Sequence, residues 1–594
     1  MIREASSSAE AVRLGDHSAD RRMIMLAAMA LFVGSGGAVS AWVLLNLIAL
    51  ATNLFWFGRL SFAEVNMADN AVGMAVLVIP MIGSVIVGLI ARFGSEKIRG
   101  HGIPEAIETI LFGESRLSMK VAILKPVSSA ISIGSGGPFG AEGPIIMTGG
   151  AIGSLFAQCF HLSAAERKTL LVAGAAAGMT AIFGTPIAAI LLAIEVLLFE
   201  WKPRSFVPVV LAVLVSFTWR PLLIGDGPMF AANLPLPTGS WSLACALGMG
   251  LLLGLQATLL SKGLYWVEDG FHHLPVHWMW WPALGSIAVG LGGLVEPQVL
   301  GAGYGNIHAL LGDSLGMRAI IMLLVVKGLV WLIALGSGTS GGVLAPLLIL
   351  GGALGCLMGQ FLPGDPGFWA MIGMAGIMSG AMRAPITGAL FAAELTGQFA
   401  ALPFCIAVAV SAYAISVLLM RRSILTEKIA RRGRHIFQEY SVDALDLLQV
   451  RDLMTAEPET LAGDMPVCEV IDFFEKEARH RSYPVIDKSG RLVGLVSRSD
   501  VLRWEVEGCD QATLLAESLS DASQPTAFPD SPSGVVADLI VQSGIGRIPI
   551  VDPDSRKVVG ILSRQDLLKA RHRIRTGETE RTRHVGGIKK GAGA

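Results

Sequence analysis

The sequence predicts an all-α polytopic membrane domain with an internal repeat, followed by a smaller soluble α/β region. Hydrophobic residues make up 53% of the chain and charged residues only 16%, whereas a soluble globular protein carries roughly 25% charged residues. From residue 23 to about 420 apolar stretches follow one another, and many reach the ~18 residues that mark a membrane helix. Beyond Arg421 the composition becomes that of a soluble protein.

Charges at both ends of the membrane body predict its orientation. Residues 1–22 are polar and lack the apolar core and cleavage site of a signal peptide. Arg21 and Arg22 directly precede the first apolar run, and positive charge favours the cytoplasmic side. Basic residues also follow the last apolar run, namely Arg421, Arg422, Lys428, Arg431, Arg432 and Arg434. We therefore expect a multi-pass protein of the cell (inner) membrane, with both ends cytoplasmic and an even number of crossings.

The membrane body repeats itself. At an offset of 202 residues one ordered series matches another: Lys125, Gly134, Ser135, Gly136, Gly140 and Pro144 meet Lys327, Gly336, Ser337, Gly338, Gly342 and Pro346. Three residues of slippage later, Gly174, Pro186 and Glu195 meet Gly373, Pro385 and Glu394. This predicts halves of about 23–225 and 226–424. An odd number of crossings in each half would make the repeat inverted, and such halves place their substrate at their interface near the midplane.

Two glycine-rich loops lie at equivalent places in the halves. Residues 134–144 lead into an apolar run at 145–156, and residues 336–346 lead into another at 347–358. Such a loop leaves backbone N–H groups unpaired at the positive end of a helix dipole, which suits an anion. Neither loop contains Lys or Arg, and a permeant ion must bind weakly enough to leave. The alternative is that these glycines only allow close helix packing.

A third loop, residues 100–105, precedes an apolar run, and residues 301–303 are its weaker echo in the second half. Glu142 stands inside the loop at 134–144. A carboxylate at membrane depth is costly and so is a functional candidate. Its charge could block an anion site until protonation releases it. The alternative is a cap for the following helix, which is compatible with gating.

These loops resemble the signatures of the CLC family of chloride channels and proton-coupled chloride transporters, over about 400 residues. The family pattern Gly-Ser-Gly-Ile-Pro matches residues 100–104, Gly-Arg-Glu-Gly-Pro matches 140–144, and Gly-x-Phe-x-Pro matches 342–346. The resemblance implies chloride as the permeant ion, voltage- or pH-dependent gating by Glu142, and a homodimer with a pore in each subunit. It implies no required cofactor. It places the anion-binding residues at His101, Gly102, Ile103, Gly140, Ala141, Gly143, Gly342, Val343 and Leu344.

Three positions depart from the family pattern. His101 replaces the serine whose hydroxyl would bind the anion, and either its ring N–H donates instead or the ring only packs. Leu425 falls where the family has a tyrosine. Coupled members carry a relay glutamate directly after another glutamate, but Glu195 is followed by Val196. We therefore expect passive conduction, with a proton-coupled antiporter as the alternative. In that alternative Glu200, one helical turn beyond Val196, is a displaced relay beside Glu195.

The soluble part repeats a second unit, at 447–504 and 514–570. Each has two short strands, at 482–487 with 492–496 and at 547–552 with 558–562, and a Gly-x-x-Ser-x-x-Asp motif. The pair is similar to tandem CBS domains. That resemblance implies a possible adenine-nucleotide site at Ser497, Asp500, Ser563 and Asp566, although a hydroxyl and a carboxylate three residues apart equally suit helix capping. The other predicted segments are a cytoplasmic N-terminus at 1–22, a basic linker at 425–446 and a disordered basic tail at 571–594.

Other classes of membrane protein fit poorly. A CBS-linked metalloprotease needs His-Glu-x-x-His to hold zinc, and none of the eleven histidines has that spacing. A cation transporter needs clustered carboxylates, but Glu142, Glu195 and Glu394 are dispersed. We expect no enzyme activity, no metal site and no nucleic-acid partner.

Overall fold

The computed structural model describes residues 22–239, 241–434, 436, 445, 448–508, 513–519 and 524–572. The chain divides into two compact units, one from His17 to Gln438 and one that contains Glu439–Ala594. The predicted N-terminal segment lies outside the described residues except for Arg22. So do the predicted tail, except for residues 571 and 572, and most of the linker beyond residue 434.

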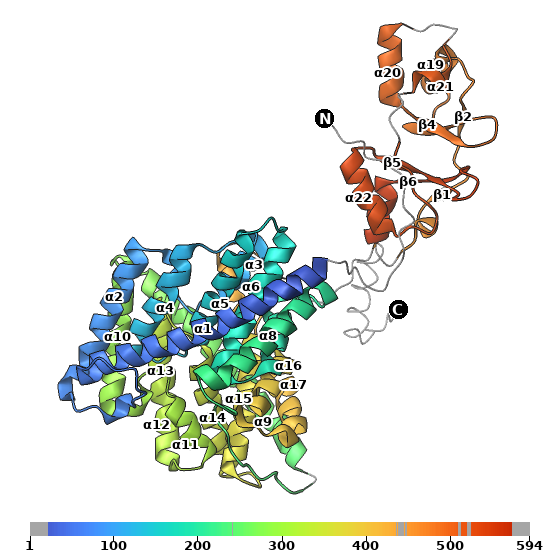
Figure 1. Cartoon of the computed structure of the whole chain (residues 1–594). Coiled ribbons are helices and arrows are strands. Elements are labelled where there is room, and N and C mark those ends of the chain that lie inside the picture. Colours follow the sequence, from blue (N-terminus) through green and yellow to red (C-terminus); the bar gives the residue numbers. More distant parts are fainter. Residues whose placement is uncertain are drawn as a thin grey trace, which may run out of the picture. The chain divides into compact units, whose positions relative to one another are not determined.

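The first half of the membrane unit contains eight α-helices, each with a counterpart in the second half. They are α1 (Arg22–Phe57), α2 (Ile79–Phe93), α3 (Ile103–Phe112), α4 (Met119–Gly134), α5 (Glu142–Gln158), α6 (Ala164–Phe183), α7 (Pro186–Leu192), which continues as a π-helix (Ala193–Leu198), and α8 (Pro203–Leu223). Short 3-10 turns lie at Met67–Asp69, Gly73–Leu77 and Glu96–Ile98. Figure 1 shows the long α1 running past α5, α6 and α8, which it contacts.

The second half repeats this order. It contains α9 (Ser242–His272), α10 (Trp281–Val295), α11 (Tyr304–Leu311), α12 (Met317–Met322) joined by a π-helix (Leu323–Lys327) to α13 (Gly328–Gly336), α14 (Leu344–Gly359), α15 (Pro366–Met382), α16 (Pro385–Thr396) and α17 (Leu402–Leu419). Its 3-10 turns are Trp278–Trp280, Pro297–Val299 and Phe399–Ala401, and α18 (Glu427–Arg431) follows. Helix α5 packs on α6 as α14 packs on α15, and α1 packs on α8 as α9 packs on α17.

Glycine explains how the central helices approach one another. A Cβ atom at Gly149 of α5 would collide with the carbonyl oxygen of Gly174 in α6, and one at Gly351 of α14 would crowd that of Gly373 in α15. Gly174 and Gly373 are repeat partners found in the sequence, and Gly149 and Gly351 are 202 residues apart like the first matching series. Small residues let helix backbones approach closely in membranes, so these glycines, which lie outside the two predicted anion loops, serve close helix packing.

Seven helical segments of the described chain are long and apolar enough to cross a membrane. They are Arg22–Phe57, Gly73–Phe93, Pro203–Leu223, Ser242–His272, Trp278–Val295, Met317–Gly336 and Phe399–Leu419. The helices α5, α6, α14 and α15 are shorter or are almost wholly buried in protein. The result is a multi-pass membrane body whose glycine-rich loops lie among buried helices.

The described part of the C-terminal unit contains two three-stranded sheets. In one, β2 (Leu461–Ala462) pairs parallel with β3 (Ser482–Ile486), which pairs antiparallel with β4 (Leu492–Ser497). In the other, β1 (Thr455–Ala456), β6 (Val558–Ser563) and β5 (Arg547–Val551) pair antiparallel in that order. The helices are α19 (Val467–Lys476), α20 (Arg498–Glu507), α21 (Leu515–Ser518) and α22 (Ser533–Ser543), with a 3-10 turn at Val450–Asp452. The strands predicted from the sequence all form.

Candidate anion pathway

The glycine-rich loops of the two halves meet in a short antiparallel bridge. The amide of Gly342 donates to the carbonyl of Gly140 at 2.9 Å, and the amide of Gly140 donates to the carbonyl of Gly342 at 3.3 Å. The pairing of equivalent residues is what a two-fold relation between the halves requires. It brings the start of α5 from one half against the start of α14 from the other.

Glu142 lies in this junction. Its side chain is 0% exposed, and its Oε1 accepts a hydrogen bond from the amide of Ala345 at 3.0 Å. A Cβ atom at Gly140 or Gly342 would collide with the carboxylate, so only glycine leaves room for it. The first-half carboxylate therefore occupies the N-terminus of the second-half helix α14, where an anion is favoured.

Free amides lie directly beside the carboxylate. Among the described residues, the N–H groups of Val343 and Leu344 donate to no protein acceptor, and both residues are buried. A buried donor without an acceptor is costly unless a ligand or water pairs with it. The arrangement suits a small anion that exchanges places with the Glu142 carboxylate.

The third loop is held by a buried lysine, Lys125, which belongs to the sequence repeat. Lys125 of α4 is 0% exposed, and its Nζ donates to the carbonyls of Ile98 and Gly100 at 2.8 Å and to Ser340 Oγ at 3.0 Å. Its repeat partner Lys327 is also 0% exposed. The absence of Lys and Arg within the loops is therefore misleading, because an ammonium from α4 contacts the loop of the second half.

The sequence repeat pairs Lys125 with Lys327, and this pairing already indicates that the two lysines have the same role. The Nζ of Lys327 donates to the carbonyls of Val299 and Gly301, both at 3.1 Å. It therefore holds the second-half loop at residues 301–303 in the same way as Lys125 holds the third loop. A lysine at equivalent positions of two apolar helices points to a shared structural task, since a lone ammonium at membrane depth is expensive.

His101 is 3% exposed, and neither ring nitrogen has a hydrogen-bond partner among the described residues. A packed histidine normally pairs at least one ring nitrogen. Its neighbour Glu105 forms ion pairs with Lys428 at 2.8 Å and Arg432 at 3.2 Å. The ring is thus a polar group with unused hydrogen-bonding capacity beside the loop of Gly102 and Ile103.

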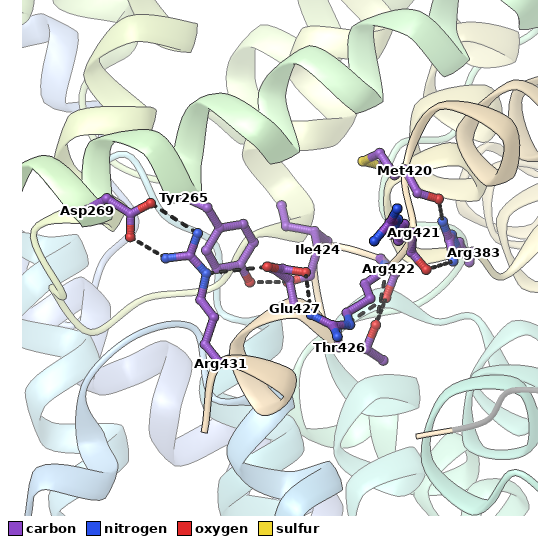
Figure 2. A network of polar contacts seen from close by, with 11 residues as sticks. Tyr265, Asp269, Arg383, Met420, Arg421, Arg422, Ile424, Thr426, Glu427 and Arg431 are labelled. Carbon is purple, nitrogen blue, oxygen red and sulfur yellow. Dashed lines mark hydrogen bonds and ion pairs between the residues drawn. The ribbon is translucent and has the colours of Figure 1, made fainter. Parts of the chain in front are cut away.

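Leu425, at the position of the family tyrosine, is 1% exposed and lies in a turn after α17. Another tyrosine holds this turn, because the Tyr265 hydroxyl of α9 donates to the carbonyl of Ile424 at 2.6 Å. Figure 2 shows Arg431 between Asp269 and Glu427, and Arg383 donating to the carbonyls of Met420 and Arg421. The turn and the residues just before it are therefore held by hydrogen bonds from two other segments, α9 and the residue that ends α15.

Two cavities adjoin the loops. One of about 450 Å³ is lined by residues of α1 and the segment after it, including Glu64, and by Ala141 and Tyr304. The other, of about 810 Å³, is lined by charged residues that include Arg99, Glu105 and several basic residues after α17. The gate candidate Glu142 directly follows Ala141 of the first cavity.

Comparison with known proteins identifies the family. The model of the voltage-gated chloride channel family matches residues 82–417. The chain belongs to the CLC family. CBS domain models match residues 450–507 and 519–573, so this CLC protein carries a C-terminal CBS pair, as the sequence predicted. Members of the family are channels and transporters.

The CLC relatives support this assignment. The chain is 30% identical over 384 residues to the voltage-gated ClC-type chloride channel ClcB of Escherichia coli (strain SMS-3-5 / SECEC), and equally so to that of Shigella flexneri. Each match covers 62% of this chain and 90% of the relative. The fold is similar to a slow cyanobacterial Cl-/H+ antiporter (TM-score 0.61, 21% identity, 70% of this chain and 99% of the other). It is also similar to a eukaryotic CLC transporter (TM-score 0.59, 19% identity, 92% of this chain and 98% of the other).

The candidate proton residue Glu195 and its repeat partner Glu394 both cap helices in this CLC chain. Glu195 Oε2 accepts from the amide of Thr387 at 2.9 Å and from its hydroxyl at 2.5 Å, which caps α16. Glu394 accepts from the amides of Ile187 and Ala188 at 3.0 and 2.7 Å, which caps α7. Each half therefore supplies one glutamate that caps a helix of the other half, and the two glutamates are repeat partners.

The expected helical position of Glu200 is wrong. The π-helix ends at Leu198, and Phe199 takes a left-handed conformation with φ 54°, so Glu200 does not share a helix face with Val196. It accepts from Ser205 Oγ at 2.9 Å and pairs with Lys168 at 3.6 Å and Lys202 at 3.4 Å. Burial, the largest single effect, raises the pKa of Glu200, but the charges of Lys168 and Lys202 and the hydrogen bonds from Ser205 and Lys202 together outweigh it, and the net shift is downward.

The Ser–Asp motifs of the CBS domains lie where the sequence placed them, at the ends of β4 and β6. The Ser497 hydroxyl donates to Asp500 Oδ2 at 2.6 Å, and the Ser563 hydroxyl donates to Asp566 Oδ2 at 2.5 Å. Ser497 and Asp500 form a capping box at the start of α20. The capping alternative is thus realised, and a carboxylate that accepts one hydroxyl retains lone pairs for a ribose hydroxyl.

Proposed function

We propose that this protein carries chloride, or a similar small anion, across the membrane along the junction of its two halves, with Glu142 as the gate. One observation supports this above all others: the Glu142 carboxylate is hydrogen-bonded to Ala345 beside the free amides of Val343 and Leu344. An anion and this carboxylate compete for the same helix N-terminus. Protonation removes the negative charge, weakens the bond to Ala345 and lets the anion enter.

Anion efflux from liposomes tests the gate. Glu142→Gln keeps the size of the side chain and removes its charge, so we expect faster efflux that no longer changes with pH, whereas wild-type efflux rises as the pH falls. Glu114→Gln, at an exposed position in the turn after α3, is a carboxylate control outside the loops. Efflux that is unchanged in Glu142→Gln across the pH range would exclude Glu142 as the gate.

Passive conduction is the mode that Val196 supports, because a valine cannot transfer a proton along the path where coupled members carry a glutamate. Coupled exchange is the competing mode, and the antiporter among the similar structures supports it. Proton movement measured during chloride efflux separates the two. Protons driven uphill by a chloride gradient would rule out the channel, and Glu195→Gln should then abolish that movement.

The remaining features of the proposal are the topology, the assembly and the regulation. Basic residues after α17 support cytoplasmic ends, which labelling of single cysteines from each side of the membrane tests. Family membership supports a homodimer, which native mass spectrometry tests.

An adenine nucleotide at Ser497, Asp500, Ser563 and Asp566 is supported by their resemblance to the family motif. ATP or AMP should then raise the unfolding temperature of the full chain, and the Asp500→Ala, Asp566→Ala variant should lose that rise.

A further inference from the structure

Tyr304 lies next to the gate and plays no part in the mechanism above. It is the first residue of α11, and its hydroxyl oxygen accepts a long hydrogen bond of 3.5 Å from the amide of Ala141. The hydroxyl hydrogen has no acceptor among the described residues. The ring packs against Phe230, with centroids 5.9 Å apart.

An unused acceptor lies on the other side of Ala141. Glu142 Oε2 is buried and has no hydrogen-bond partner among the described residues. The charge of the Glu142 carboxylate acts on the Tyr304 hydroxyl, as does that of Glu64. The Tyr304 hydroxyl, an unused donor, contacts Ala141, and the unused acceptor Glu142 Oε2 belongs to the next residue of the gate loop. A hydrogen bond between the two would lower the free energy of both groups.

A cavity next to Ala141 offers space for the Glu142 carboxyl group once it has left the junction. Ala141 and Tyr304 both line the cavity of about 450 Å³, so this cavity reaches Tyr304 and the residue directly before Glu142. The repeat equivalent of Tyr304 is Ile103, which has no hydroxyl. The hydroxyl thus belongs to one half only, as does the Glu142 carboxylate, and both meet the same end of the pathway.

We propose that Tyr304 is the positioning residue for the open gate: its hydroxyl donates to the Glu142 carboxyl group after this has left the amide of Ala345 and turned towards the cavity. The inference rests on the proposed function, since it requires Glu142 to be the gate. Tyr304 then stabilises the open state without binding the anion.

A double-mutant cycle on chloride efflux from liposomes tests this role. Tyr304→Phe keeps the ring and its packing on Phe230 but removes the donor. The open-state carboxyl group is protonated, and a hydrogen bond to a neutral group corresponds to roughly a fivefold change in an equilibrium, so we expect Tyr304→Phe to lower efflux by about that factor. In the Glu142→Ala background it should have no effect, because no carboxyl group is left to hold.

Two further variants sharpen the test. Tyr304→His supplies a ring N–H donor and should recover part of the efflux. Tyr413→Phe, on α17, is a matched removal of a hydroxyl away from the gate and should leave efflux unchanged. The inference is overturned if Tyr304→Phe lowers efflux equally in both backgrounds, since the hydroxyl then serves the fold or the anion path, or if it has no effect in either. Failure of the proposed gate is separate, because Glu142→Ala alone would then leave efflux unaltered.

Discussion

At the scale of single residues, the gate depends on which half supplies the charge and which supplies the amide. Glu142 belongs to the first half, and the amide of Ala345 that it contacts belongs to the second. The equivalent second-half position is Leu344, which contributes only backbone to the site. A gate that belonged to both halves would place two like charges in one junction, which is unfavourable.

Lys125 gives a prediction at this scale. Lys125→Met should leave the carbonyls of Ile98 and Gly100 without their ammonium donor, and each unsatisfied buried group costs about 1–3 kcal/mol. We expect a total loss of roughly 2–6 kcal/mol, read as a lower unfolding temperature in detergent, together with slower anion efflux. Lys262→Met, at an exposed position of α9, is the control. Equal stability of the two variants would contradict the structural role of Lys125.

At the scale of elements, the two halves are joined by an exchange of helix caps. Glu195 caps α16, and Glu394 caps α7, although each glutamate lies in the opposite half. Carboxylates at helix N-termini interact favourably with the helix dipole. The exchange therefore orients two helices that begin with proline after a tight turn.

Removing either cap should destabilise the membrane unit to a similar extent. Glu195→Ala and Glu394→Ala should each cost about 1–2 kcal/mol, the usual effect of losing an N-cap. Thermal unfolding of the purified protein measures the change. Thr387→Val, which removes one of the two donors to Glu195, should have a smaller effect, and a larger loss for it than for Glu195→Ala would refute the capping argument.

The stability of the turn between β3 and β4 of the CBS unit is expected to depend on pH. Hydrogen bonds from the Ser489 hydroxyl and from the Arg491 and Ser489 amides hold the pKa of Asp487 below its usual range. A depressed folded-state pKa contributes stability above the unfolded value of about 3.9, and this is lost as the pH falls through the folded value. The protection factors of the amides in the turn between β3 and β4, corrected for the pH dependence of intrinsic exchange, should therefore fall below about pH 4 in wild type. In Asp487→Asn this pH dependence should disappear, and its persistence would contradict the argument.

At the scale of the whole molecule, the membrane unit and the CBS unit have separate cores. The apolar cluster of the membrane unit is independent of the two small clusters of the CBS domains. We therefore predict that a chain that ends at Gln438 inserts, folds and conducts chloride. Liposome efflux of this shorter chain measures it, and complete loss of efflux would show that the CBS unit is part of the conducting assembly.

The sequence by itself determined the membrane body, the repeat, the CBS pair and the anion-site candidates, because hydropathy and glycine spacing are local properties. Glu142 could be singled out for the same reason: a carboxylate in an apolar loop is conspicuous on its own. Only the tertiary structure decided what these residues contact. It placed Glu142 on Ala345 of the other half, Lys125 on Ser340 and Tyr304 beside Ala141, and it ended the helix before Glu200. These facts depend on residues far apart in the chain, or on a local backbone conformation, that no sequence period encodes.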